Sequence, residues 1–81
     1  MTLDALRAAL DEVDAALIDA LARRAALVRE IWAWKEAHGL PRFDPAREQE
    51  LRSRLVQRAV ERGLSPDAVE AVLAQVIGKP L

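Results

Sequence analysis

Two cations, Arg24 and Lys35, have the types and spacing to bind an anion from one face of a predicted helix. Because an α-helix turns by about 100° and rises by about 1.5 Å per residue, they lie about 20° apart around the axis and about 16 Å apart along it. Two like charges facing one interior need a bound anion or partner carboxylates, and the gap between them suits a small molecule with two anionic groups. Taken alone, Arg24 has a simpler interpretation, in which its guanidinium reaches water or pairs with a carboxylate of another helix.

Glu48 is the acidic side chain expected on the same interior. It lies about 20° around its helix from Leu55 and about 60° from Leu51, on the apolar face. An inward carboxylate can accept a hydrogen bond from a buried hydroxyl or ammonium group. A surface ion pair with Arg52, four residues further on, explains Glu48 equally well.

Three other charged residues have simple local interpretations. Asp44 is best explained as a helix N-cap, and Arg47 as part of the solvated first turn that follows. Arg7 lies about 25 Å before Arg24 and about 100° around the helix, so the two cannot share a pocket within one chain. In an antiparallel dimer Arg7 could reach the pocket of the partner chain, although an ordinary exposed pair with a nearby aspartate is the simpler interpretation.

The composition of the 81-residue chain narrows the chemistry further. Twelve basic and thirteen acidic residues nearly cancel and are interspersed, which argues against partners recognised by bulk charge, such as nucleic acid or an anionic membrane. The chain has no cysteine and a single histidine, His38, which excludes thiolate nucleophiles and disulfides and argues against a metal site. Its first residues resemble neither a signal peptide nor a membrane span, so a cytoplasmic protein with one domain is expected.

Helix start and stop signals predict an all-α fold with one long helix, two shorter helices and no strands. The first helix has no glycine or proline before Gly39 and is roughly 36 residues long. Each of the other two begins with a capping residue followed by proline. The expected helices run from Thr2 to Gly39, from Asp44-Pro45 to about Arg62, and from Ser65-Pro66 to Gly78.

An apolar seam runs along the first helix and predicts a dimer. Its residues follow a strict spacing of three and four, and Arg24 is the one polar member. A helix of roughly 36 residues is about 54 Å long, whereas a compact 81-residue globule has a radius of gyration near 12 Å, about a quarter of that length. Two short helices cannot cover the seam, so we expect an intertwined homodimer in which a second chain buries the rest. Trp32 and Trp34 are interpreted as packing residues, and the seam consists of Leu3, Leu6, Leu10, Val13, Leu17, Ala20, Arg24, Leu27, Ile31 and Trp34.

Several stretches of the sequence carry a resemblance to a known family. They are Leu6-Arg7 with Asp11 and Asp14, Leu21-Ala22-Arg23-Arg24, Ile31 to Lys35 and, most specifically, Gly39-Leu40-Pro41-Arg42-Phe43-Asp44-Pro45-Ala46-Arg47-Glu48. Together they make the chain similar to the small all-helical chorismate mutases, a class of intertwined dimers found alone or fused to prephenate dehydratase or dehydrogenase. The resemblance covers nearly the whole chain, as a single domain over residues 1–81.

The resemblance implies an isomerase that rearranges chorismate to prephenate, on the route to phenylalanine and tyrosine, with no cofactor and no metal. Such enzymes hold the two substrate carboxylates so that the enolpyruvyl arm folds over the ring, and they stabilise charge on the breaking ether oxygen. Carried over by position, Arg24 and Arg7 of the partner subunit would clamp the carboxylates. Lys35 would reach a carboxylate and the ether oxygen, and Glu48 would take the ring hydroxyl. The remaining implied substrate contacts are the backbone of Asp44, the charge of Arg47 and the apolar walls Ile31, Leu51 and Ile77.

One departure from the family pattern concerns the end of the third helix. Fully active members present a glutamine or glutamate to the ether oxygen, with a serine one turn earlier. Here Pro80 stands at the serine position, and the sequence ends at Leu81, before the glutamine. Losing one such donor typically costs about 3 kcal/mol of transition-state stabilisation, so low activity is expected unless docking to, or fusion with, another shikimate-pathway enzyme compensates. A domain cut from a longer fusion explains the ending equally well.

Alternatives to chorismate mutase activity stay open. A mutase for 4-amino-4-deoxychorismate would offer Glu48 an ammonium group in place of the hydroxyl, and glutamate can serve either. Isochorismate pyruvate lyases lack the Asp-Pro-x-Arg-Glu run seen from Asp44 to Glu48, which argues against that activity. A non-catalytic helical dimerisation or regulatory module would use Arg24 and Lys35 only in ion pairs and would bind no small dicarboxylate.

Overall fold

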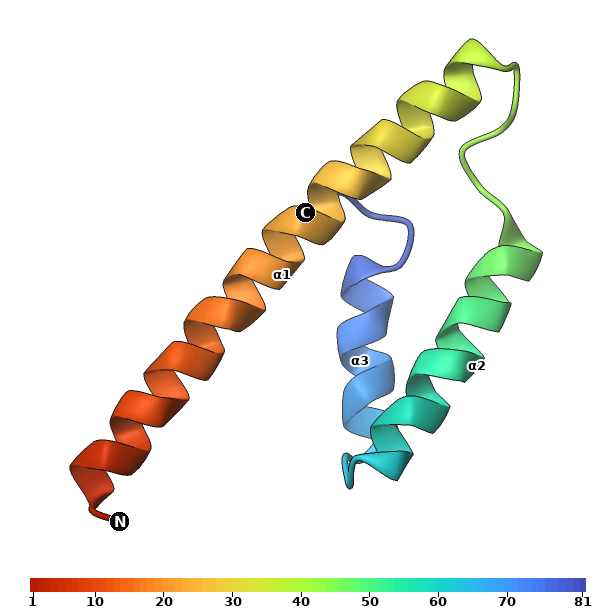
Figure 1. The fold of residues 1–81 in the computed structure, drawn as a ribbon. Coiled ribbons are helices and arrows are strands. Elements are labelled where there is room, and N and C mark those ends of the chain that lie inside the picture. Colours follow the sequence, from red (N-terminus) through yellow and green to blue (C-terminus); the bar gives the residue numbers. More distant parts are fainter.

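The computed structural model describes residues 1–81 and contains three α-helices and no strands. Helix α1 spans Leu3–Ala37, α2 spans Pro45–Glu61 and α3 spans Pro66–Val76. Helices α2 and α3 form a hairpin beside the C-terminal half of α1, and the N-terminal half of α1 extends beyond it (Figure 1). The predicted all-α fold, with one long and two shorter helices, is confirmed. No helix combines the length and the apolar character that crossing a membrane requires.

The helices begin at the capping residues that the sequence indicates. Thr2 Oγ1 accepts a hydrogen bond of 3.1 Å from the Ala5 amide, and Ser65 Oγ accepts one of 3.4 Å from the Ala68 amide. Helices α2 and α3 each have a proline in the first turn, where a backbone donor would have no partner within the helix. Local sequence therefore fixes where each helix starts, and with it the direction in which the side chains of the first turn project.

The small core of the chain is centred on α3. Leu73, Val76 and Ile77 form its buried cluster, and α3 lies between the other two helices (Figure 1). Only five residues of the chain are buried, the others being Ala25 of α1 and Ala59 of α2. The partly buried side chains that pack against the cluster come from all three helices and are Leu21, Leu51, Leu55, Val56 and Val69.

The N-terminal half of α1 has an apolar seam that nothing in this chain covers. Leu3, Leu6, Leu10, Val13 and Leu17 are all at least half exposed, between 51% and 63%. The molecule is 55 Å long, and its radius of gyration of 16.0 Å exceeds the roughly 12 Å of a compact globule of this size. The two short helices thus leave the seam uncovered, as expected, and burial by a second chain stays a prediction.

The face that α1 turns toward its own hairpin is offset from the predicted seam. Leu27, Ile31 and Trp34 belong to the seam and remain 40%, 52% and 57% exposed. Residues at a 3,4 spacing form the stripe of α1 against which a second long helix would pack. The short α2–α3 hairpin contacts the stripe of α1 next to it. The buried or partly buried residues of α1 are Leu21, Arg24, Ala25, Val28, Trp32 and Lys35, and Arg24 is the one residue that also belongs to the seam.

Candidate active site

A cleft of about 160 Å³ lies between α1, the start of α2 and the residues that follow α3. Every site residue expected from the sequence lines it, with the exception of Arg7. The expected residues that the structure brings together here are Arg24, Ile31, Lys35, Asp44, Arg47, Glu48, Leu51 and Ile77. Sequence analysis did not single out the other four lining residues as site residues, namely Val28, Trp32, Arg42 and Gly78.

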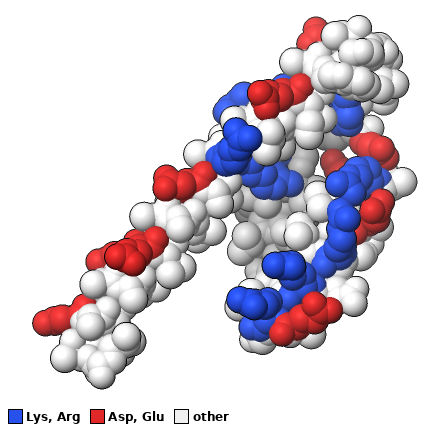
Figure 2. All heavy atoms as spheres, in the orientation of Figure 1, with Lys and Arg blue, Asp and Glu red and all other residues white.

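The cleft has a surplus of positive charge. Four of its lining residues are cations and two are carboxylates, so the formal charge is four minus two, or +2. Lys and Arg side chains of α1 and α2 lie beside the space between these helices, interspersed with acidic ones, whereas acidic side chains dominate the visible part of the N-terminal half of α1 (Figure 2). Fixed cations in a partly enclosed cleft favour binding of an anion, and a dianion would neutralise this surplus.

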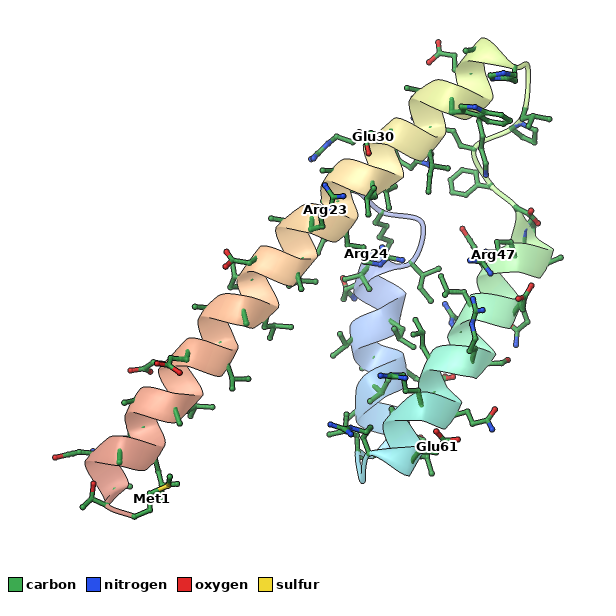
Figure 3. The ribbon with its side chains drawn as sticks, in the orientation of Figure 1. Met1, Arg23, Arg24, Glu30, Arg47 and Glu61 are labelled. Carbon is green, nitrogen blue, oxygen red and sulfur yellow. The ribbon has the colours of Figure 1, made fainter.

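Arg24 lies between α1 and α3 (Figure 3). Its Nη1 donates a hydrogen bond to the backbone carbonyl of Val76, at the C-terminal end of α3, where the helix dipole is negative. The same carbonyl also accepts a hydrogen bond of 3.2 Å from the Lys79 amide. Arg24 forms no ion pair within the chain. A guanidinium has five N–H donors, so the contact with Val76 leaves donors for a ligand. The ion pair considered as an alternative for Arg24 is therefore not present within this chain.

Lys35 is partly buried and is held by the connector between α1 and α2. Its Nζ donates a hydrogen bond of 3.1 Å to the backbone carbonyl of Arg42. The Arg42 guanidinium lies 4.3 Å from the centre of the Trp32 ring, within cation–π range. Trp32 was interpreted from the sequence as a packing residue, and in the structure it lines the cleft and packs against the Arg42 guanidinium. Its position three residues before Lys35 could have indicated that it lines the cleft, because the two share a face of the helix, but not that it contacts Arg42.

The first turn of α2 supplies Asp44 and Arg47. Asp44 Oδ1 accepts a hydrogen bond of 3.1 Å from the Arg47 amide, which confirms the predicted N-cap. The Arg47 side chain is 53% exposed, and its Nη1 lies 3.4 Å from Glu50 Oε1. Exposed ion pairs of this kind contribute about 0–1 kcal/mol, so the Arg47 guanidinium is free to turn toward a ligand.

Glu48 is partly buried and lies against the backbone that follows α3. It forms no ion pair with Arg52, the alternative considered from the sequence. A Cβ added to Gly78 would lie 2.6 Å from Glu48 Oε1, so the Glu48 carboxylate would have to move away from its present position. Gly78 has a φ of +69° and had been interpreted only as a helix stop, because sequence spacing cannot show that it meets α2.

Arg7 is exposed on the N-terminal half of α1, away from the cleft. This agrees with the helical geometry, which places Arg7 too far from Arg24 to share a pocket within one chain. No ion pair joins Arg7 to a nearby aspartate. Whether Arg7 acts in the cleft of a second chain belongs to the proposals below.

Comparison with known proteins identifies the family. The sequence model of the family described as chorismate mutase type II matches residues 6–79. The chain belongs to this family. The match includes Arg7 and every residue that lines the cleft, from Arg24 to Gly78. No solved structure was found to match the chain.

The curated relatives of the chain have two kinds of name. The T-protein of Enterobacter agglomerans is 41% identical over 75 residues, which are 93% of this chain and 20% of that protein. The 4-amino-4-deoxychorismate mutase of Streptomyces pristinaespiralis is 33% identical over 75 residues, 93% of this chain and 58% of the relative. A protein of the same name from Streptomyces venezuelae is 37% identical over 62 residues, 76% of this chain and 60% of the relative. The chain thus spans a fifth of the T-protein and less than two thirds of either mutase.

Proposed function

We propose that this chain is an isomerase that rearranges chorismate to prephenate, a step in the biosynthesis of phenylalanine and tyrosine. The observation that carries the proposal is the convergence of Arg24, Lys35 and Glu48 on one cleft, in a chain of the chorismate mutase type II family. Chorismate carries two carboxylates, which matches the +2 formal charge of the cleft. A cytoplasmic location, expected from the composition, is part of the same proposal.

To catalyse this reaction the enzyme must hold the substrate in one conformation and stabilise charge, and it needs no side chain that reacts with the substrate. One ether C–O bond breaks and one C–C bond forms within a single molecule, so no proton, nucleophile or leaving group has to be handled. Arg24 and Lys35 hold the carboxylates, which brings the enolpyruvyl arm over the ring. Lys35 also faces the ether oxygen as negative charge grows on it. The Glu48 carboxylate accepts a hydrogen bond from the ring hydroxyl.

The remaining residues shape and complete the cleft. Ile31, Leu51 and Ile77 form apolar walls that exclude water and strengthen the electrostatic contacts. The backbone at Asp44 and the half-exposed Arg47 guanidinium also line the cleft and assist binding.

The active form is proposed to be an intertwined homodimer. The support is the exposed apolar seam of α1, which a second copy of the same long helix can cover. In an antiparallel arrangement, Arg7 of the partner subunit is carried toward the cleft and becomes a further carboxylate ligand. Sedimentation at micromolar concentration tests this, and a folded monomer there would contradict it.

A docked or fused second enzyme of the shikimate pathway is a further part of the proposal. The matched region occupies only a fifth of the T-protein, which supports the idea that domains of this type work beside other sequence. Copurification and turnover measured with and without the neighbouring enzyme would test it.

The central experiment follows the loss of chorismate and identifies the product for the wild type, Arg24→Ala and Lys35→Ala. Removing one preorganised donor to a developing oxyanion typically lowers kcat by about 10²- to 10³-fold, and we expect a loss of this size for Lys35→Ala. Arg24→Ala removes a carboxylate ligand, so it should lower kcat/KM through weaker binding and orientation of the substrate. Arg23→Ala is the matched control, because Arg23 is exposed, does not line the cleft and adjoins Arg24. Unchanged turnover in both cleft variants would show that the wrong cleft has been assigned.

A second candidate substrate is 4-amino-4-deoxychorismate. It is favoured by the relatives that carry the corresponding mutase name and by Glu48, whose carboxylate can accept hydrogen bonds from an ammonium group as well as from a hydroxyl. The two substrates should be compared in the same assay. Glu48→Gln retains an acceptor but removes the charge, so it should impair the amino substrate more than chorismate. If the wild type neither binds nor converts either compound, a non-catalytic helical module becomes the better explanation.

A further inference from the structure

The connector between α1 and α2 is joined to α1 at two residues, Leu40 and Arg42. The Leu40 amide donates a hydrogen bond of 2.8 Å to the backbone carbonyl of Lys35. Arg42 makes two contacts with that helix: its guanidinium lies 4.3 Å from the centre of the Trp32 ring, and its carbonyl accepts the 3.1 Å hydrogen bond from Lys35 Nζ. The side chains of Leu40 and Phe43 are 49% and 67% exposed, so Arg42 supplies the side-chain contact of the connector with α1. The part of the connector beyond Leu40 is therefore held to α1 by Arg42.

The two contacts of Arg42 act on one face of α1. Trp32 and Lys35 are three residues apart, so they are neighbours on the helix surface. Trp32 holds the side chain of Arg42, and the backbone of Arg42 in turn holds the ammonium of Lys35. We use the term clasp for these three residues, Trp32, Lys35 and Arg42.

The clasp restricts the direction of the Lys35 ammonium group, which lysine alone leaves variable. An ammonium group on a flexible four-carbon stem has no fixed direction, unlike a guanidinium. The Arg42 carbonyl engages one of its three N–H donors and thereby restricts the directions of the other two. Those two remain for a ligand in the cleft, which Lys35 also lines.

We propose that Trp32 and Arg42 are positioning residues that act through Lys35: the aromatic ring fixes the guanidinium, and this places the carbonyl that orients the ammonium. This inference rests on the proposed function, because it assigns the benefit to the rearrangement step. Neither residue needs to touch the substrate. The clasp is complete within one chain and needs no second copy.

Loss of the clasp should change kcat more than KM. Displacing a group whose interaction with the substrate strengthens in the transition state lowers kcat. The other cations of the cleft still bind the substrate in the ground state, so KM changes little. We expect Trp32→Ala and Arg42→Ala each to lower kcat by about 10-fold or more, with KM within about 3-fold of wild type. Both variants keep the Arg42 carbonyl, so they release Lys35 without removing its acceptor.

Conservative and control variants separate positioning from a general loss of structure. Trp32→Phe keeps an aromatic face for the guanidinium and should recover most of the kcat lost in Trp32→Ala. The double variant Trp32→Ala/Arg42→Ala should be no slower than either single variant, because both remove the same contact. Phe43→Ala and Arg23→Ala remove an exposed aromatic and an exposed arginine outside the cleft, and both should match wild type.

The outcomes distinguish this inference from the proposed function. If the wild type converts chorismate and both alanine variants do so at the same rate, the clasp is refuted and the function stands. If Arg42→Ala raises KM at constant kcat while Trp32→Ala changes neither, Arg42 binds the substrate directly and the positioning role is refuted. If the wild type is inactive, amide hydrogen exchange decides: the Leu40 amide donates a hydrogen bond of 2.8 Å to the Lys35 carbonyl. Faster exchange of this amide in both alanine variants supports the clasp, and unchanged exchange overturns it.

Discussion

Replacing Gly78 by alanine is expected to damage the cleft far more than the fold. Gly78 and Gly63 both have positive φ, +69° and +80° respectively. A residue with a Cβ pays about 1–2 kcal/mol in this left-handed region, so Gly78→Ala and Gly63→Ala should lower the free energy of unfolding by similar amounts. Gly63→Ala is therefore a matched control for backbone strain.

The two variants differ in what the new Cβ meets. At Gly63 nothing lies within 4 Å, whereas at Gly78 the Cβ would lie 2.6 Å from Oε1 and 3.5 Å from Cδ of Glu48. The carboxylate ends a flexible side chain, so it moves while the backbone stays in place. A hydrogen bond to a charged group contributes about 1.5–3 kcal/mol. Since about 1.4 kcal/mol corresponds to a factor of ten, losing the hydrogen bond from Glu48 to substrate should lower kcat/KM roughly 10- to 100-fold.

The assay combines chemical denaturation with steady-state kinetics on wild type and both variants, at one protein concentration because association affects apparent stability. The expected result is similar destabilisation of both variants, with the loss of kcat/KM confined to Gly78→Ala. If Gly78→Ala retains kcat/KM within about 2-fold of wild type, Glu48 does not act where the cleft places it. If Gly63→Ala loses as much activity, the effect comes from backbone strain and the argument from the Cβ contact fails.

Two further predictions concern the N-cap of α2 and the exposed seam of α1. Asp44→Ala removes the acceptor of the Arg47 amide and should lower the free energy of unfolding by about 1 kcal/mol. Asp44→Asn keeps an acceptor and should retain most of the stability of the cap. Thermal or urea unfolding measures both variants, and equal stability of all three proteins would contradict the role of the cap. Leu10→Glu places a charge in the exposed seam and should shift the protein toward monomer in sedimentation. Glu12→Ala changes a nearby exposed residue outside the seam and should cause no such shift. A dimer unaffected by Leu10→Glu would exclude the seam as its interface.

The features that could be predicted from the sequence are those that depend on near neighbours. Thr2, Asp44 and Ser65 cap their helices through amides three residues away, so a short stretch of sequence contains both partners. The inward direction of Arg24 and Lys35 follows from helical spacing alone. The length of α1 follows from the absence of glycine and proline before its end.

The features that sequence reasoning missed depend on the paths of the connectors. Arg42 reaches Trp32 because the chain turns back after α1, and no spacing rule describes that return. Gly78 meets Glu48 only because α3 ends beside the first turn of α2. Both contacts join segments from different elements, so residue types and local periodicity could not indicate them.

The cleft and the exposed seam meet at shared residues, so the proposed dimer would link substrate binding to association. Arg24 and Ile31 belong to both, and Ile31 is 52% exposed although it lines the cleft. A second copy packed along the seam would therefore cover the open side of the cleft, exclude water there and bring in Arg7 of the partner subunit. Turnover should then fall together with the dimer fraction, both on dilution and in Leu10→Glu. A Leu10→Glu monomer with wild-type kcat/KM would show instead that one chain forms a complete active site, and that the seam serves another purpose.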